Sequence, residues 1–82
     1  MAKVKFYATL RHAAGVREAE MQADSVTELL ELLSRQYGGK LDRYLKMSIV
    51  LVNGRNVRDL KGKKTRIKPD DVVSIYPPLG GG

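Results

Sequence analysis

The sequence predicts a two-layer α+β domain, in which one main helix packs on one face of a small sheet. Two observations predict it. Several segments alternate apolar and polar residues with the period of half-buried strands, and one longer segment repeats its apolar residues with the period of a helix. A chain of 82 residues can build one modest core. We therefore expect a single domain, residues 1–76, followed by an extended tail, residues 77–82.

The first two strands are predicted as a hairpin at the N-terminus. Residues 3–10 alternate from Val4 to Leu10, and a loop is expected around residues 11–15. Residues 17–23 alternate again, with polar side chains on the outer face: Glu18, Glu20 and Gln22.

A helix is predicted to begin at Ser25. Ser25 and Glu28 have the spacing of a capping box, in which the serine hydroxyl accepts from the amide of residue 28 and the glutamate reaches back to the serine amide. The apolar residues that follow recur at helical spacing, and they are Val26, Leu29, Leu30, Leu33 and Tyr37. Gly38 and Gly39 are expected to end the helix.

The remaining strands are predicted in the second half of the chain. Residues 49–52 form an apolar run, and Asn53-Gly54 after it is typical of a tight hairpin turn, because both central positions need positive φ. A short return strand is expected before Val57. Residues 72–76 form the last strand, which ends at Pro77 because proline cannot donate to a strand ladder.

Composition limits the chemistry that the chain can carry. It has no cysteine, which excludes disulfides, thiolate metal sites and a catalytic thiol, and His12 is its only histidine. We therefore expect no metal and no bound cofactor, and a loop or surface role for His12. The longest apolar run is too short to span a bilayer, so we expect a cytoplasmic protein.

The net charge of +6 is concentrated in one segment, residues 55–68, which we call the basic segment. It contains seven basic residues and one acidic residue, so the rest of the chain sums to zero. Three interpretations remain open: a solvated surface, a docking patch for an acidic partner, or a nucleic-acid site. The last is the least favoured, because no aromatic residue is interleaved there to stack on bases.

Asp70-Asp71 is the one adjacent carboxylate pair before a strand. Neighbouring residues on a strand point to opposite faces, and Pro69-Asp70-Asp71 is typical of a turn. We expect a structural role for it.

The C-terminal tail is the strongest candidate for function. Pro77-Pro78 fixes φ at two positions and keeps Tyr76 extended, so the chain leaves the sheet as a stiff rod. Fully stretched, residues 77–82 reach roughly 20 Å, enough to thread a narrow channel in another protein. The group at the end is the α-carboxylate of Gly82, a poor electrophile that needs activation as an acyl phosphate or acyl adenylate. The alternative is a frayed terminus with no function.

These residues resemble a known family. The run Pro69-Asp70-Asp71-Val72, through Ile75-Tyr76 into Pro77-Pro78-Leu79-Gly80-Gly81-Gly82, resembles the MoaD branch of the MoaD/ThiS ubiquitin-like sulfur carriers. Residues 4–8 with Leu10-Arg11 look like the first strand of that family, and Val52-Asn53 lies where its third strand turns. The resemblance implies a β-grasp fold: one mixed sheet of four to five strands, one main helix on one face, and a flexible C-terminal tail.

The resemblance also implies a function for the tail. An adenylyltransferase of the MoeB/ThiF kind would use ATP to adenylate Gly82, and sulfur would replace AMP to give a thiocarboxylate. The obligatory Gly-Gly pair of the family maps onto Gly81-Gly82. A MoaE-like large subunit of molybdopterin synthase would take the loaded tail, so the chain itself would be a non-catalytic subunit that binds no cofactor.

The residues expected to bind partners lie in or near the tail. They are Phe6, Arg11, Tyr76, Pro77, Pro78, Leu79 and Gly80. Other functions stay open: attachment to protein lysines as a ubiquitin-like modifier, sulfur supply for thiamin synthesis or transfer-RNA thiolation, and a basic nucleic-acid-binding module. The Pro-Pro pair favours the MoaD branch.

Overall fold

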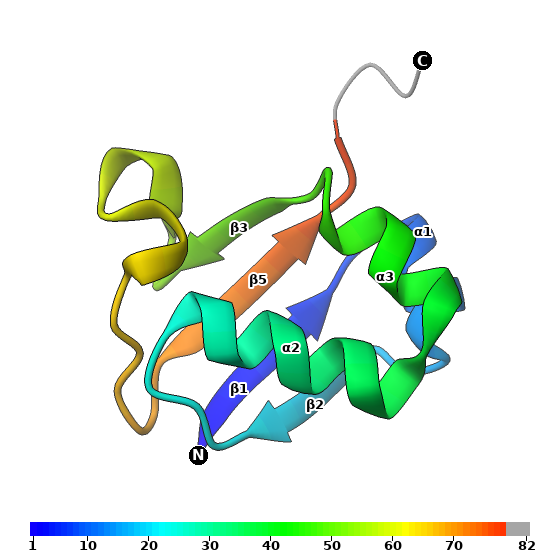
Figure 1. The fold of residues 1–82 in the computed structure, drawn as a ribbon, viewed down its shortest axis with the longest axis horizontal. Coiled ribbons are helices and arrows are strands. Elements are labelled where there is room, and N and C mark those ends of the chain that lie inside the picture. The colour runs from blue at the N-terminus through cyan, green and yellow to red at the C-terminus, as the bar shows by residue number, and fades with distance from the viewer. Residues whose placement is uncertain (79–82) are drawn as a thin grey trace.

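A five-stranded sheet with helices packed on one face forms the domain (Figure 1). The computed structural model describes residues 1–78, so the predictions for Leu79, Gly80, Gly81 and Gly82 lie outside the described residues. The strands are β1 (Ala2–Phe6), β2 (Glu18–Met21), β3 (Ile49–Val52), β4 (Arg55–Asn56) and β5 (Val72–Tyr76). The helices are α1 (Thr9–Ala14), α2 (Val26–Tyr37) and α3 (Gly39–Leu45), with short 3-10 turns η1 (Val57–Asp59) and η2 (Gly62–Lys64).

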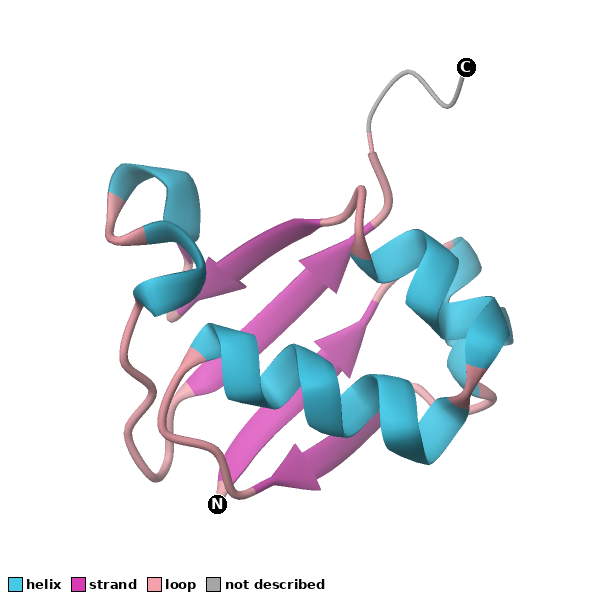
Figure 2. Cartoon of the chain, in the orientation of Figure 1, coloured by secondary structure: helices cyan, strands magenta, loops and turns pink. Residues whose placement is uncertain are grey.

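The sheet is mixed, as the resemblance implied. Its order is β2-β1-β5-β3-β4, with β1 parallel to β5 and the other pairs antiparallel. Strands β1 and β5, which are far apart in the sequence, therefore lie side by side in the middle of the sheet. Because they are parallel, their C-terminal residues lie at the same end of the sheet. The helix α2 crosses one face, while α1 and α3 pack near one end (Figure 2).

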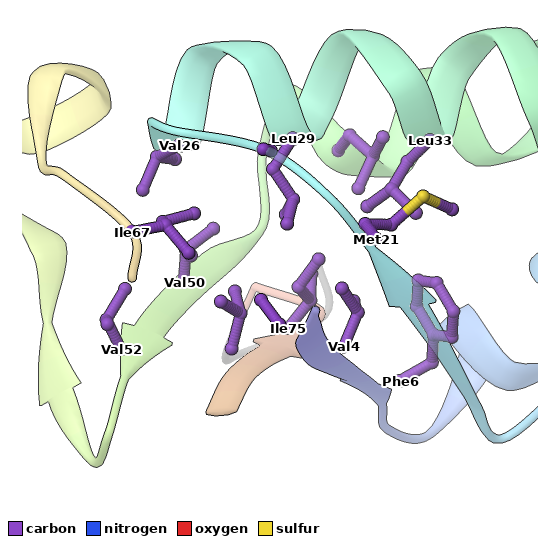
Figure 3. Close-up of a cluster of buried hydrophobic side chains, with 14 of the residues drawn as sticks. Val4, Phe6, Met21, Val26, Leu29, Leu33, Val50, Val52, Ile67 and Ile75 are labelled. Carbon is purple, nitrogen blue, oxygen red and sulfur yellow. The ribbon is translucent and has the colours of Figure 1, made fainter. Parts of the chain in front are cut away.

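The core lies between α2 and the inward face of the sheet (Figure 3). The predicted helical stripe supplies Val26, Leu29 and Leu33, all fully buried. The sheet supplies the alternate residues of its two central strands, Val4, Phe6, Val73 and Ile75. The apolar residues that alternate along the strands thus pack against those that recur every 3.6 residues along α2, as predicted.

The start of α2 has a capping box with one change from the prediction. Ser25 Oγ accepts from the Glu28 amide at 3.2 Å, as expected. The Glu28 carboxylate, however, accepts from the amide of Asp24, at 3.3 Å, and not from that of Ser25. Ser25 is held extended by an isolated antiparallel bridge to Arg66, which sets the direction of the chain entering the helix.

Two short helices were not predicted, and the first strand is shorter than expected. β1 ends at Phe6, because the chain turns sharply at Ala8, where φ is +53°. Leu10 is buried as predicted, but from α1, in the segment expected to be a loop. The helix α3 follows Gly38, so the glycine pair ends one helix and begins another. None of the helices in residues 1–78 is long and apolar enough to cross a membrane.

The hairpin after β3 is confirmed. Asn53 and Gly54 have φ of +51° and +83°, the left-handed values that the Asn-Gly pair predicts. β3 ends at Val52, directly before this turn, and β4 is the short return strand. β5 covers the predicted residues and stops before Pro77.

Candidate functional site

Two tyrosines form a stacked pair where the chain leaves the sheet. In the parallel pairing of β1 and β5, Phe6 lies opposite Ile75, so Tyr7 comes beside Tyr76 on the other face. Their ring centroids are 4.3 Å apart and the ring planes differ by 10°. The Tyr7 amide donates to the Ile75 carbonyl at 3.1 Å, which carries the parallel pairing one residue past β1. The end of β5 before Pro77 is therefore held by two interactions with Tyr7: the stacking of its ring on Tyr76 and the hydrogen bond of its amide to Ile75.

Arg11 extends this pair from α1. Its guanidinium carbon lies 5.6 Å from the centroid of the Tyr7 ring, within the range of a cation–π contact. Its Nε donates to the carbonyl of Phe6 at 3.0 Å, which fixes the side chain against the end of β1. We call Tyr7, Arg11 and Tyr76 the tyrosine cluster. It presents aromatic surface and one exposed positive charge at the base of the tail.

Phe6 does not belong to this surface. It is 1% exposed, and its ring meets that of Tyr37 edge-on at 5.8 Å and 80°. The alternation of a strand puts one of each neighbouring pair inside, and here Phe6 and Ile75 point inward while Tyr7 and Tyr76 point outward. The expectation that Phe6 contacts a partner directly is therefore wrong: its role is in the core.

The environment of Tyr76 affects its ionisation. Desolvation by burial, followed by the neighbouring phenol of Tyr7, raises the pKa of Tyr76 above its usual value of 10.0. Tyr76 is therefore a neutral phenol at physiological pH, able to donate or accept a hydrogen bond.

The described part of the tail is Pro77-Pro78. Both residues are half-buried, and Pro78 lines a groove on the helix side of the sheet. The predicted partner-binding residues Tyr76, Pro77, Pro78 and Arg11 thus gather at one end of the domain, where β5 ends (Figure 1).

Residues 4–82 match the ThiS family, a match that spans nearly the whole chain and includes the tail. The chain belongs to the ThiS family. This confirms the predicted MoaD/ThiS resemblance at the level of the family, whose members are ubiquitin-like sulfur carriers and modifiers, small proteins that are not themselves enzymes.

Known proteins from archaea illustrate the range of this family. A protein of Archaeoglobus fulgidus whose name proposes a sulfur carrier is 33% identical, with 89% of this chain and 96% of that protein covered. The solution structure of small archaeal modifier protein 1 from Methanosarcina acetivorans has a TM-score of 0.86 and 31% identity, covering 99% of this chain and 95% of that one. A Pyrococcus furiosus structure, titled as a proposed subunit 1 of a molybdopterin converting factor, has a TM-score of 0.77 and 26% identity, covering 95% and 97%. The β-grasp fold is confirmed.

The other candidate residues have structural places in this ThiS-family chain. The Asp71 carboxylate accepts from the Lys68 amide at 2.8 Å and from Asn53 Nδ2 at 2.9 Å, so it joins two turns, in agreement with its predicted structural role. Asp70 has φ of +70° in the same turn. His12 is exposed on α1. Within residues 1–78, no three His, Cys, Asp or Glu side chains gather as a metal site would require.

Of the two neighbours Phe6 and Tyr7, sequence reasoning selected Phe6 as the partner-binding residue. The signal was present, because strict alternation from Val4 and Phe6 assigns Tyr7 to the outer face, and Val73 and Ile75 assign Tyr76 to the same face. The pairing of β1 with β5 brings the two together, and that contact depends on strand order, which periodicity alone does not specify.

Proposed function

We propose that this chain is a sulfur carrier that works through the carboxylate of Gly82. A carboxylate oxygen attacks the α-phosphorus of ATP, pyrophosphate leaves, and the acyl adenylate forms. A hydrosulfide equivalent then attacks the carbonyl carbon, the bond to AMP breaks, and a thiocarboxylate remains. Both steps take place in a MoeB/ThiF-like adenylyltransferase, which binds the ATP.

One observation carries the proposal: the last central strand runs without a linker into Pro77-Pro78. The family match, which continues to residue 82, supports it. β5 is paired on both sides, by β1 and β3, so the exit point of the tail is rigid. A rigid exit point lowers the entropy that a partner must remove to hold the terminus in its active site. The tyrosine cluster offers that partner a surface beside the exit.

The sulfur acceptor that we propose is the precursor of molybdopterin, with this chain as the small subunit of a molybdopterin synthase beside a MoaE-like large subunit. The Pro-Pro pair before the glycines supports this branch, as does the likeness to the Pyrococcus furiosus protein. The likeness to small archaeal modifier protein 1 favours a second candidate, attachment of Gly82 to protein lysines.

Intact mass spectrometry tests the carrier chemistry. The protein is incubated with ATP, a MoeB/ThiF-like adenylyltransferase and a sulfide source, beside a variant that lacks Gly81 and Gly82. We expect the mass gain of one oxygen replaced by one sulfur in the full chain and no gain in the shortened one. An unchanged mass, with an adenylyltransferase that loads its own carrier normally, would reject the proposal.

A second step separates the two candidates. The loaded protein is mixed with a MoaE-like subunit and the sulfur-free pterin precursor. In a parallel reaction without sulfide, the unloaded protein is mixed with ATP, the adenylyltransferase and a cell extract that supplies lysine-bearing proteins, so that a lysine amine can displace AMP from the acyl adenylate. Conversion to a dithiolene with return of the unloaded carrier supports the molybdopterin branch. Stable isopeptide conjugates, with no pterin conversion, support the modifier.

A further inference from the structure

A groove beside the tail is not used by the chemistry above. It lies on the helix side of the sheet, between the start of α2, β3 and the basic segment, and its volume is about 480 Å³. We call it the α2–β3 groove. Pro78 is part of its lining, so the groove reaches the point where the described chain ends.

The lining of the groove is apolar at its base. Val26, Val50 and Val57 are core residues that also reach the groove, and Leu30 on α2 is only half-buried beside them. Met47 lines it from the segment between α3 and β3 and is 64% exposed. An unbranched, exposed methionine is a side chain that can adapt to a bound partner. This base suits an apolar side chain supplied from outside.

Basic residues surround this apolar base. Lys46, Arg58 and Lys63 line the groove and are exposed. All seven basic residues of the basic segment are exposed as well: Arg55, Arg58, Lys61, Lys63, Lys64, Arg66 and Lys68. At the opposite edge of the sheet, β2 carries Glu18 and Glu20. The excess of positive charge therefore lies in the basic segment, of which Arg58 and Lys63 line the groove. Such charges attract acidic groups over about 8 Å at physiological ionic strength.

We propose that the α2–β3 groove is a docking site for an acidic segment of a partner protein, with an apolar side chain in the groove and carboxylates on Lys46, Arg58 and Lys63. The apolar contact supplies affinity, while the charges speed and orient association. Because Pro78 lines the groove, a protein that holds the tail is also next to it. Only the identity of this partner protein rests on the proposed function. Binding at the groove can be tested without it.

The groove favours a protein segment over nucleic acid. Among residues 1–78, none that lines the groove is aromatic, whereas single-stranded nucleic acid is bound by stacking its bases on aromatic rings. An apolar base would also be left uncovered under a phosphate backbone.

The first experiment is a titration of the ¹⁵N-labelled full chain with a synthetic peptide that alternates acidic residues and leucine. We expect amide shifts at Met47, Ser48 and Lys63, and a dissociation constant of about 1 mM or tighter. A peptide with serine in place of leucine should bind about tenfold more weakly. Equal binding by the serine peptide, stronger binding of oligouridylate at the same amides, or no shift at millimolar peptide would each overturn the proposal.

Matched variants connect the binding to the groove. Arg58→Glu with Lys63→Glu should weaken peptide binding by about tenfold, or about 1.4 kcal/mol. Lys40→Glu with Arg43→Glu makes the same change in charge on α3, away from the groove, and should leave binding within about twofold. Met47→Ser, at an exposed position, tests the apolar contact without loss of fold. Equal losses in both charge variants, or unchanged binding with Met47→Ser, would contradict the proposal.

This result is independent of sulfur loading. If the chain binds the peptide but is never adenylated, the docking proposal is supported and the proposed function is rejected. If the chain is loaded with sulfur but does not bind the peptide, the proposed function is supported and the docking proposal is rejected.

Discussion

The rings of Tyr7 and Tyr76 stack with centroids 4.3 Å apart, and Tyr76 is the last strand residue before Pro77. Their contact joins the two parallel central strands at the point where the tail begins. An offset aromatic pair contributes about 0.5–1.5 kcal/mol beyond the area that it buries. The stack should therefore stabilise the exit of the tail measurably.

A double-mutant cycle measures this contact. We expect Tyr7→Ala and Tyr76→Ala to be less than additive in the free energy of unfolding, with a coupling of about 0.5–1.5 kcal/mol. Urea denaturation followed by circular dichroism gives the four values. Glu18→Ala with Tyr76→Ala is the control, because Glu18 is exposed on β2, and that pair should be additive. Additivity of the tyrosine pair would show that the stack contributes nothing to stability.

The raised pKa of Tyr76 predicts a change of stability at high pH. A phenol whose pKa is higher in the folded chain holds its proton where the unfolded chain has lost it. Its contribution is complete below pH 10 and is lost as the pH rises from 10 through the folded pKa. The wild type should therefore lose more stability than Tyr76→Phe above pH 10, and the difference between them should be constant below it. Unfolding free energies at pH 8 to 11 provide the check, and a constant difference throughout would contradict the shift.

Sequence patterns predicted those boundaries of helices and strands that are determined by residues close together in the chain. Ser25 and Glu28 marked the start of α2, Asn53-Gly54 marked the β3 hairpin, and Pro77 marked the end of β5, because each acts through its own backbone or its near neighbours. The tail could be singled out for the same reason.

What was missed depends on contacts between distant segments. Leu10 fits the period of β1, but the chain leaves the strand at Ala8, and Leu10 is buried from α1 through its packing in the core. Its spacing to Ala13 and Ala14, before Gly15 in the left-handed conformation, was the available sign of a helix. The α2–β3 groove likewise needs the basic segment to fold beside α2, which no local pattern specifies.

The two faces of the sheet should respond differently to the same substitution. Leu33 on α2 is fully buried against the covered face, whereas Leu51 on β3 is half-exposed on the open face. Leu33→Ala should cost about 2–5 kcal/mol of unfolding free energy, because it leaves a cavity in the core. Leu51→Ala should cost less, since solvent fills the space. Denaturant midpoints measure both, and equal costs would mean that the open face is packed as tightly as the core.

Two glycines with equally open surroundings separate backbone strain from packing. A Cβ at Gly54 or at Gly39 would meet no atom within 4 Å, so neither substitution causes a clash. Gly54 has φ of +83° in the hairpin turn, and Gly39 begins α3 without a positive φ. Gly54→Ala should therefore destabilise the fold by about 1–2 kcal/mol through the left-handed backbone alone. Gly39→Ala should stabilise it by about 0.4–1 kcal/mol, because alanine restricts the unfolded chain. Thermal and urea unfolding of both variants give the signs, and a loss of stability for Gly39→Ala equal to that for Gly54→Ala would show that backbone conformation is not what distinguishes the two positions.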